Sequence, residues 1–189
     1  MMQAAPLTGG FTAPATQSAQ AFRAIMEAMA RPGTCHEITG ATPPAPLSTA
    51  AGSVLLTLCD ADTPVFLAGA ADTAEIRAWL AFHTGAPLAG PSGCMFALGT
   101  WEALAPLGAY PAGSAQYPDR SATLIVECAQ LAPSGANLRG PGIKAQAALS
   151  LPETAAFRAN HARFPLGRVD FIFTAGSRLA ALPRSTEVL

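Results

Sequence analysis

The chain has 189 residues, of which 50% are hydrophobic and only 12% are charged, with a formal net charge of -1. This length suits one compact domain with a substantial core. The near-neutral charge gives no basic surface of the kind that binds nucleic acid or an anionic membrane. The N-terminal segment lacks the basic and apolar regions of a secretory signal, and no apolar run approaches the roughly 18 residues of a membrane span. We therefore expect a cytoplasmic protein without nucleic-acid or membrane partners.

The N-terminal segment differs in composition from the rest of the chain. It is rich in Gly, Ala, Thr and Pro and has no hydrophobic period. We expect a flexible arm over residues 1–15 that becomes ordered only against a partner or within a dimer. No low-complexity linker divides residues 16–189, which are predicted to form a single domain.

Apolar residues at helical spacing predict two helices in the first third of the chain. The first follows a cap at Thr16 or Ser18 and ends at Pro32-Gly33. The second begins at Ser48 or Thr49. The apolar stripe of the first helix, a core or interface face, consists of Phe22, Ile25, Met26 and Met29.

A third helix has the clearest boundaries. Asp72 and Glu75 have the spacing of a capping box, and Gly85 provides a left-handed stop. Its apolar face consists of Ile76, Trp79, Leu80 and His83.

Towards the C-terminus, Ser150 and Glu153 suggest another capping box, which opens a helix through about residue 161. Residues 169–174 and 179–182 are predicted to pair as a hairpin. The remaining predicted strands are 35–38, 65–67, 94–98 and 122–128. The last of these is apolar enough to be central in a sheet that is covered on both faces. We predict an α/β fold, a mixed β-sheet with helices on both faces.

Residues 140–145 read GPGIKA, which fits the GxGxxA pattern of dinucleotide-binding turns. No clear strand leads into it and no acidic residue follows at the distance that would hold a ribose. A tight turn before a helix is the favoured interpretation. The alternative is a weak anion site, in which the backbone at Gly140 and Gly142 approaches the ligand while Arg139 and Lys144 add positive charge.

Standard nucleophile and metal motifs are absent from the sequence, and we expect no metal and no cofactor. Lys144 is the only lysine, so pyridoxal phosphate attachment would depend on it alone, and no other residue suggests that cofactor. The cysteines are too widely spaced for CxxC chemistry and are expected to be reduced and structural. They are Cys35, Cys59, Cys94 and Cys128.

Four further side chains could contact a ligand or a partner, and three of them are kept as candidates. His83 shares an apolar helical face, which favours a hydrogen-bonded histidine over an acid-base catalyst. Asp60 and Asp62 could bind a metal, although an Asx turn is favoured. Arg184 could bind a phosphate, with an ion pair as the default. Asp62, His83 and Arg184 are therefore kept as candidates.

An ordered set of sequence blocks resembles one family. The chain is similar to the H subunit of the bacterial carbon-phosphorus lyase system over nearly its whole length from residue 18. The family's usual acidic residue after FPLG is displaced by Arg168-Val169 before Asp170, and residues 99–120 match poorly. The blocks are FRAIMEAMARPG (22–33), SVLLTLCDADTPVFL (53–67), FHTGAPL (82–88), SATLIVEC (121–128), RGPGI (139–143) and FPLGRVDFIFTAGSRLAALPRST (164–186).

The resemblance implies a homodimer-forming subunit that assembles with the G, I and J subunits into a core complex. It also implies a fold similar to that of pyridoxal-phosphate-dependent transferases, without the cofactor. Together with the G, I and L proteins, the family is required to exchange the adenine of ATP for a phosphonate, which gives a ribose 1-phosphonate 5-triphosphate. The J subunit later cleaves the carbon-phosphorus bond. No catalytic residues are assigned to the H subunit.

Three functions remain open. A structural subunit is favoured, and it predicts inactivity alone with tight partner binding. A module that binds phosphate, phosphonate or nucleotide predicts measurable affinity for such a ligand. An independent transferase is least favoured, because no motif supplies a nucleophile, a base and an orienting group together.

Overall fold

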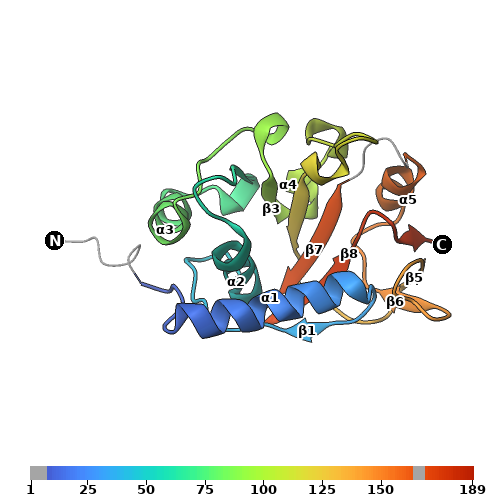
Figure 1. Ribbon diagram of the computed structural model, residues 1–189, viewed down its shortest axis with the longest axis horizontal. Coiled ribbons are helices and arrows are strands. Elements are labelled where there is room, and N and C mark those ends of the chain that lie inside the picture. The colour runs from blue at the N-terminus through green and yellow to red at the C-terminus, as the bar shows by residue number, and fades with distance from the viewer. Residues whose placement is uncertain (1–7, 164–168) are drawn as a thin grey trace.

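A six-stranded sheet forms the centre of the computed structural model, which describes residues 8–163 and 169–189. The strand order is β1-β8-β7-β4-β3-β2, with β4 in the interior as predicted (Figure 1). The parallel strands are β2 (Val65–Leu67), β3 (Phe96–Thr100), β4 (Thr123–Glu127) and β7 (Asp170–Ala175). The antiparallel additions at one edge are β8 (Arg178–Leu182) and β1 (His36–Glu37). The predicted mixed sheet and the predicted hairpin are both confirmed.

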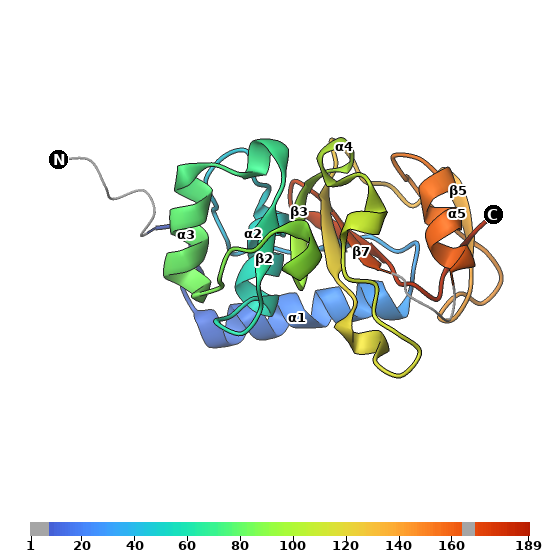
Figure 2. The same cartoon turned by 90° about the horizontal axis from the view of Figure 1, so that it is seen from above.

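Helices cover both faces of this sheet, as predicted (Figures 1 and 2). One face carries α1 (Pro14–Ala30), α2 (Thr49–Leu58) and α3 (Ala74–Thr84), and the other carries α4 (Trp101–Leu104) and α5 (Ala155–Ala162). Side chains that alternate along β4 explain the two layers, because Ile125 packs with the first group of helices while Leu124 and Val126 pack with the second.

A second, three-stranded antiparallel sheet was not predicted. It has the order β6-β5-β9 and packs on the α5 side of the core. Its strands are β5 (Ala136–Arg139), β6 (Ala147–Leu149) and β9 (Glu187–Val188). Leu138, Leu149 and Val188 are its buried contributions. Short 3-10 turns complete the described chain: η2 (Gly69–Ala71), η3 (Pro91–Gly93), η4 (Leu107–Ala109) and η5 (Pro118–Arg120).

The N-terminal arm contacts its own domain where it is described. Residues 1–7 lie outside the described residues. From Thr8 onwards the chain packs near α3, where the Trp79 indole N–H donates to the Thr8 carbonyl oxygen at 3.1 Å. α1 then begins at Pro14, ahead of the predicted caps, because a proline suits the first turn of a helix. The prediction of a cap at Thr16 or Ser18 is wrong.

The apolar stripe predicted for α1 is only partly buried. Ile25 is in the core, whereas Phe22 and Met26 are 51% and 53% exposed. Ala21 and Ala28 form the rest of the buried face. Small alanine side chains let α1 pack closely against its neighbours. The buried face of α1 is therefore the one that carries Ala21, Ile25 and Ala28, and the larger side chains of Phe22 and Met26 lie outside it.

The predicted start of α2 is confirmed, because the Ser48 hydroxyl caps it by accepting the Ala51 N–H at 3.1 Å. For α3 the predicted cap is displaced by one residue. Thr73 caps the helix, while Asp72 forms an ion pair with Arg77. The predicted left-handed stop at Gly85 is confirmed by its φ of 71°.

The capping box predicted for α5 is wrong. Ser150 accepts the Ala132 N–H at 2.9 Å and so holds a neighbouring loop. Thr154 occupies the cap position without a side-chain bond, and Glu153 accepts the Ala156 N–H at 3.2 Å. Strand β3 likewise begins two residues later than the predicted span 94–98.

Candidate functional site

The predicted anion-binding residues lie in the connection between β5 and β6. Arg139 is the last residue of β5, and its Nε and Nη2 atoms donate to Glu187 Oε2 at 3.0 and 2.6 Å. Gly140 and Gly142 follow with φ of 147° and 81°, and Lys144 is exposed. β5 leads directly into this turn, and β6 follows it in the sequence. The prediction of a turn that precedes a helix, with no strand before it, is therefore wrong.

Gly142 is required by close packing. A Cβ at this position would lie 1.9 Å from the carbonyl oxygen of Ala30, the last residue of α1. Glycine also tolerates the positive φ of the turn. The neighbouring carbonyl oxygen is an acceptor, and the Arg139 charge is matched by Glu187. The anion-binding role of this turn stays a prediction.

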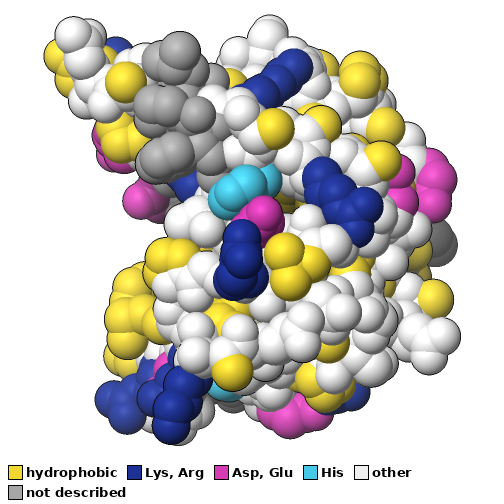
Figure 3. Space-filling view, turned by 90° about the vertical axis from the view of Figure 1, so that its right-hand side faces the viewer, with side chains coloured by type: hydrophobic (Ala, Val, Ile, Leu, Met, Phe, Trp, Pro, Cys, Tyr) yellow, Lys and Arg dark blue, Asp and Glu magenta, His cyan; other side chains and the backbone are white. Residues whose placement is uncertain are grey.

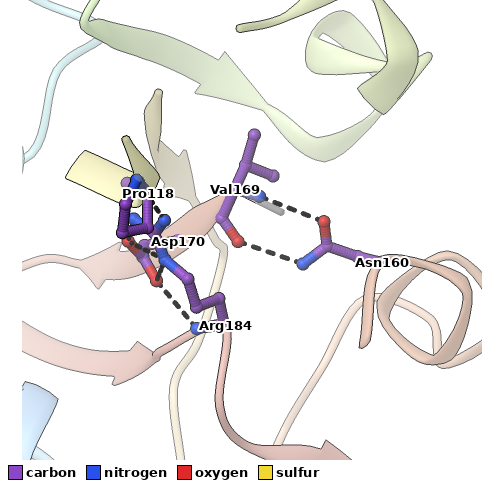
Figure 4. Close-up of polar contacts among 5 residues, drawn as sticks. All are labelled: Pro118, Asn160, Val169, Asp170 and Arg184. Carbon is purple, nitrogen blue, oxygen red and sulfur yellow. Dashed lines mark hydrogen bonds and ion pairs between the residues drawn. The ribbon is translucent and has the colours of Figure 1, made fainter. Parts of the chain in front are cut away.

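Arg184 is held by its own chain at the start of β7 (Figure 4). Its Nε donates to the Asp170 carboxylate oxygens at 3.1 and 3.0 Å, and Nη2 donates to the same carboxylate. Its backbone N–H adds a bond of 2.7 Å to Asp170, and Nη1 donates to the Pro118 carbonyl oxygen. The two side chains are only 24% and 11% exposed. The default ion pair is thus present, and a ligand role for Arg184 stays a prediction.

Asn160 fixes α5 against the same strand (Figure 4). Its Nδ2 donates to the Val169 carbonyl oxygen at 3.0 Å, and the Val169 N–H donates to its Oδ1 at 3.1 Å. One side chain therefore pairs with both backbone groups of the residue that precedes β7. Sequence reasoning missed this contact, which connects a helix to a strand across the undescribed residues 164–168.

His83 is half-buried near the end of α3. Its ring centroid lies 5.2 Å from that of Trp79 and 4.9 Å from that of Phe82. Its Nε2 lies 3.2 Å from the Thr8 carbonyl oxygen. These contacts match the favoured hydrogen-bonded histidine, and the ligand or interface role stays a prediction.

The Asx turn favoured for the CDADTP segment is confirmed. The Asp62 N–H donates to Asp60 Oδ1 at 2.9 Å, and the Thr63 hydroxyl donates to the Asp60 carbonyl oxygen at 3.0 Å. The Asp62 side chain is exposed, and its role as a ligand or interface residue stays a prediction.

Glu127 is a largely buried carboxylate that sequence reasoning missed. It ends β4, the interior strand, and accepts the Ser48 N–H at 2.7 Å and the Thr174 hydroxyl at 3.0 Å. Burial raises the pKa of the Glu127 carboxyl above its ordinary value. The carboxylate joins the start of α2 to the carboxyl ends of β4 and β7. An acidic residue inside the apolar run ATLIVEC was the signal that could have identified it.

A pocket of about 540 Å³ lies between α5 and the segment from α4 to η4. Trp101, Pro106 and Leu107 form one wall, and Ala156 and Ala159 form the wall on α5. Its polar lining residues are Glu102, Glu153, Asn160 and Arg163. Figure 3 views the side of the molecule that includes α5 and the second sheet, where basic and acidic side chains lie close to a histidine.

All four cysteines are free, as predicted. Cys59 and Cys94 are buried, and burial raises their thiol pKa values to about 12 and about 11. Such thiols are poor nucleophiles near neutral pH. Within the described ranges, no group of three or more His, Cys, Asp or Glu is placed to hold a metal ion. In that same part of the chain, no helix has the length and hydropathy needed to cross a bilayer.

Comparison with known proteins supports the family resemblance that the sequence blocks indicated. The family model described as bacterial phosphonate metabolism protein (PhnH) matches residues 9–189. A relative from Rhizobium meliloti (strain 1021) is 39% identical over 193 residues, covering 96% of this chain and 94% of the relative. That relative is named alpha-D-ribose 1-methylphosphonate 5-triphosphate synthase subunit PhnH. The chain therefore belongs to the PhnH family of bacterial phosphonate metabolism proteins.

Proposed function

We propose that this chain is a non-catalytic subunit of the carbon-phosphorus lyase system. With its partner subunits it converts a phosphonate and ATP to a ribose 1-phosphonate 5-triphosphate and adenine. The observation that carries this proposal is the family match over residues 9–189, together with a relative that is named as a subunit of such a synthase.

The contacts of the candidate side chains support a structural role. Arg139 and Arg184 have carboxylate partners in the same chain, Glu187 and Asp170. A guanidinium group in this state would have to exchange its carboxylate for a ligand, which costs free energy. These arginines therefore stabilise the second sheet and the start of β7 more readily than they bind substrate.

The proposed partners are a second copy of the chain and the G, I and J subunits, with the L protein acting in the same reaction. Support comes from α1, where Phe22 and Met26 are about half exposed, at 51% and 53%. They lie one turn apart on the outer face of the helix, and methionine adapts well to varied contact surfaces. Burial of these side chains against a partner would remove apolar surface from water.

Other features of the proposal follow from the family resemblance. The complex is expected to act in the cytoplasm, and the fold is expected to resemble that of pyridoxal-phosphate-dependent transferases without the cofactor. An anion site at the β5–β6 turn is the second candidate function. The exposed side chain of Lys144 supports it.

Reconstitution tests the proposal. The G, I and L proteins are mixed with ATP and methylphosphonate, with and without this chain, and adenine release is followed by chromatography. We expect release only when the chain is present, and co-purification of the chain with G, I and J. Adenine release by the pure chain would favour the independent transferase instead.

A further inference from the structure

The pocket beside α5 has walls that suit a flat apolar ligand. Trp101 is half-buried and stacks on the core residue Phe157, with ring centroids 4.6 Å apart and an interplanar angle of 29°. Ala156 and Ala159 present only methyl groups from α5. An indole ring and small side chains leave room for a planar ring and offer it stacking surface.

The walls are held in place by contacts behind them. Phe157 also packs edge-on against Phe171 of the sheet, at 4.9 Å between centroids. Asn160 pairs with both backbone groups of Val169 and so fixes the far end of α5. A pocket with fixed walls loses little conformational entropy when a ligand enters.

Two carboxylates line the pocket, together with the Asn160 amide and the Arg163 guanidinium. Glu102 lies in the first turn of α4, and Glu153 lies just before α5. Glu153 is half-buried and keeps its position by accepting the Ala156 N–H at 3.2 Å. Ionised carboxylates only accept hydrogen bonds, so a ligand beside them must donate N–H or O–H groups.

The position within the fold agrees with a ligand site. α4 begins directly after Thr100, the last residue of β3, so Glu102 lies beyond the carboxyl end of a parallel strand. Ligands of open α/β sheets bind outside these strand ends. The pocket volume of about 540 Å³ is within the range of roughly 300–1,000 Å³ for small-molecule sites.

We propose that this pocket binds a planar heterocycle that bears an amino group, namely adenine. The base stacks beside Trp101 and the alanines of α5, and its exocyclic amine donates to Glu102 and Glu153. The choice of adenine among such heterocycles rests on the proposed function, in which adenine leaves ATP. The pocket thus provides this subunit with a binding role in a reaction that its partners catalyse.

Calorimetry on the isolated full-length chain tests the proposal with adenine and with purine, which lacks the amino group. We expect adenine to bind with a dissociation constant on the order of 0.1 mM, and purine to bind about tenfold more weakly. Equal affinities would overturn the role of the carboxylates. A dissociation constant for adenine above about 10 mM would overturn the site itself.

Variants locate the binding within the molecule. Ala159→Phe fills the pocket from an exposed helical position and should abolish adenine binding, whereas Ala78→Phe, on the exposed side of α3, should not. Glu102→Gln should weaken binding about fivefold to tenfold, because the charge-assisted bond is lost. Glu75→Gln, in the first turn of α3, is the matched control and should have no effect. Loss of binding in both phenylalanine variants, or in neither, would place adenine elsewhere.

The binding and pathway experiments fail independently. If the reconstituted subunits release adenine without this chain, the proposed function is wrong whatever the calorimetry shows. A different set of results would make only the pocket proposal wrong. In that case adenine release requires the chain, the Ala159→Phe variant supports release as well as the unchanged chain does, and calorimetry detects no adenine binding. Circular dichroism of each variant confirms that it is folded.

Discussion

Removal of the Asp170 carboxylate tests the account of the start of β7. Asp170→Ala removes the carboxylate that accepts from the Arg184 guanidinium, whose side chain is only 24% exposed, and from the Arg184 backbone N–H. Breaking one side of a buried ion pair costs about 3–5 kcal/mol. Because this pair retains some solvent contact, we expect a loss of about 3 kcal/mol in the free energy of unfolding. In a domain of this size that lowers the melting temperature by roughly 6–12 °C.

Urea unfolding followed by circular dichroism measures this loss, with the midpoint and slope fitted separately. Asp72→Ala is the matched control, because it removes a carboxylate from another bidentate arginine pair whose side chains are 53% and 33% exposed. The control should lose much less stability, since exposed pairs contribute little. Equal losses, or a loss under about 1 kcal/mol for Asp170→Ala, would refute the reasoning.

Four further predictions concern single residues. Burial raises the pKa of the Glu127 carboxyl above 4.5, so the folded state holds that proton more tightly than the unfolded state does. The contribution of Glu127 to the free energy of unfolding should therefore fall as the pH rises above 4.5. A pH-independent difference in urea melts between the unchanged chain and Glu127→Gln would contradict this. Gly142→Ala should lower the free energy of unfolding by about 2 kcal/mol or more in the same assay, because its Cβ would clash with the Ala30 carbonyl oxygen. Gly90→Ala, which has no atom near its added Cβ, should lower it far less. Similar losses in the two variants would exclude the clash as the cause. In the native protein, Cys59 should react with a thiol reagent near pH 8 only on unfolding, because burial raises its pKa to about 12; rapid modification of the folded chain would show that it is accessible. Lys144→Ala should leave adenine release by the reconstituted subunits intact, and its loss would assign the lysine a direct role.

Local sequence signals predicted the helices and the main sheet well. The Ser48 cap, the Gly85 stop and the β7–β8 hairpin depend on neighbouring residues, so the sequence pattern contains them. The second sheet was missed because each of its short strands has a single large apolar residue, and because β5 pairs with β9 from the far end of the chain. Such short strands have no detectable hydrophobic period.

The site was harder to predict because its chemistry depends on distant pairs. Arg139 and Arg184 were identified as cations, but the sequence does not show that Glu187 and Asp170 neutralise them. Glu127 contacts Ser48 across 79 positions. The pocket is lined by alanines, whose small side chains leave room for a ligand. Motif searches do not select alanine. Family resemblance succeeded where motifs failed, because it uses the order of blocks along the chain.

The central claim is that this chain is a required subunit that does not itself catalyse the reaction. The most direct measurement is adenine release from ATP and methylphosphonate by the purified G, I and L proteins, with and without this chain, alongside the chain alone. The account predicts release only in the complete mixture. Full release without the chain, or turnover by the chain alone, would contradict it.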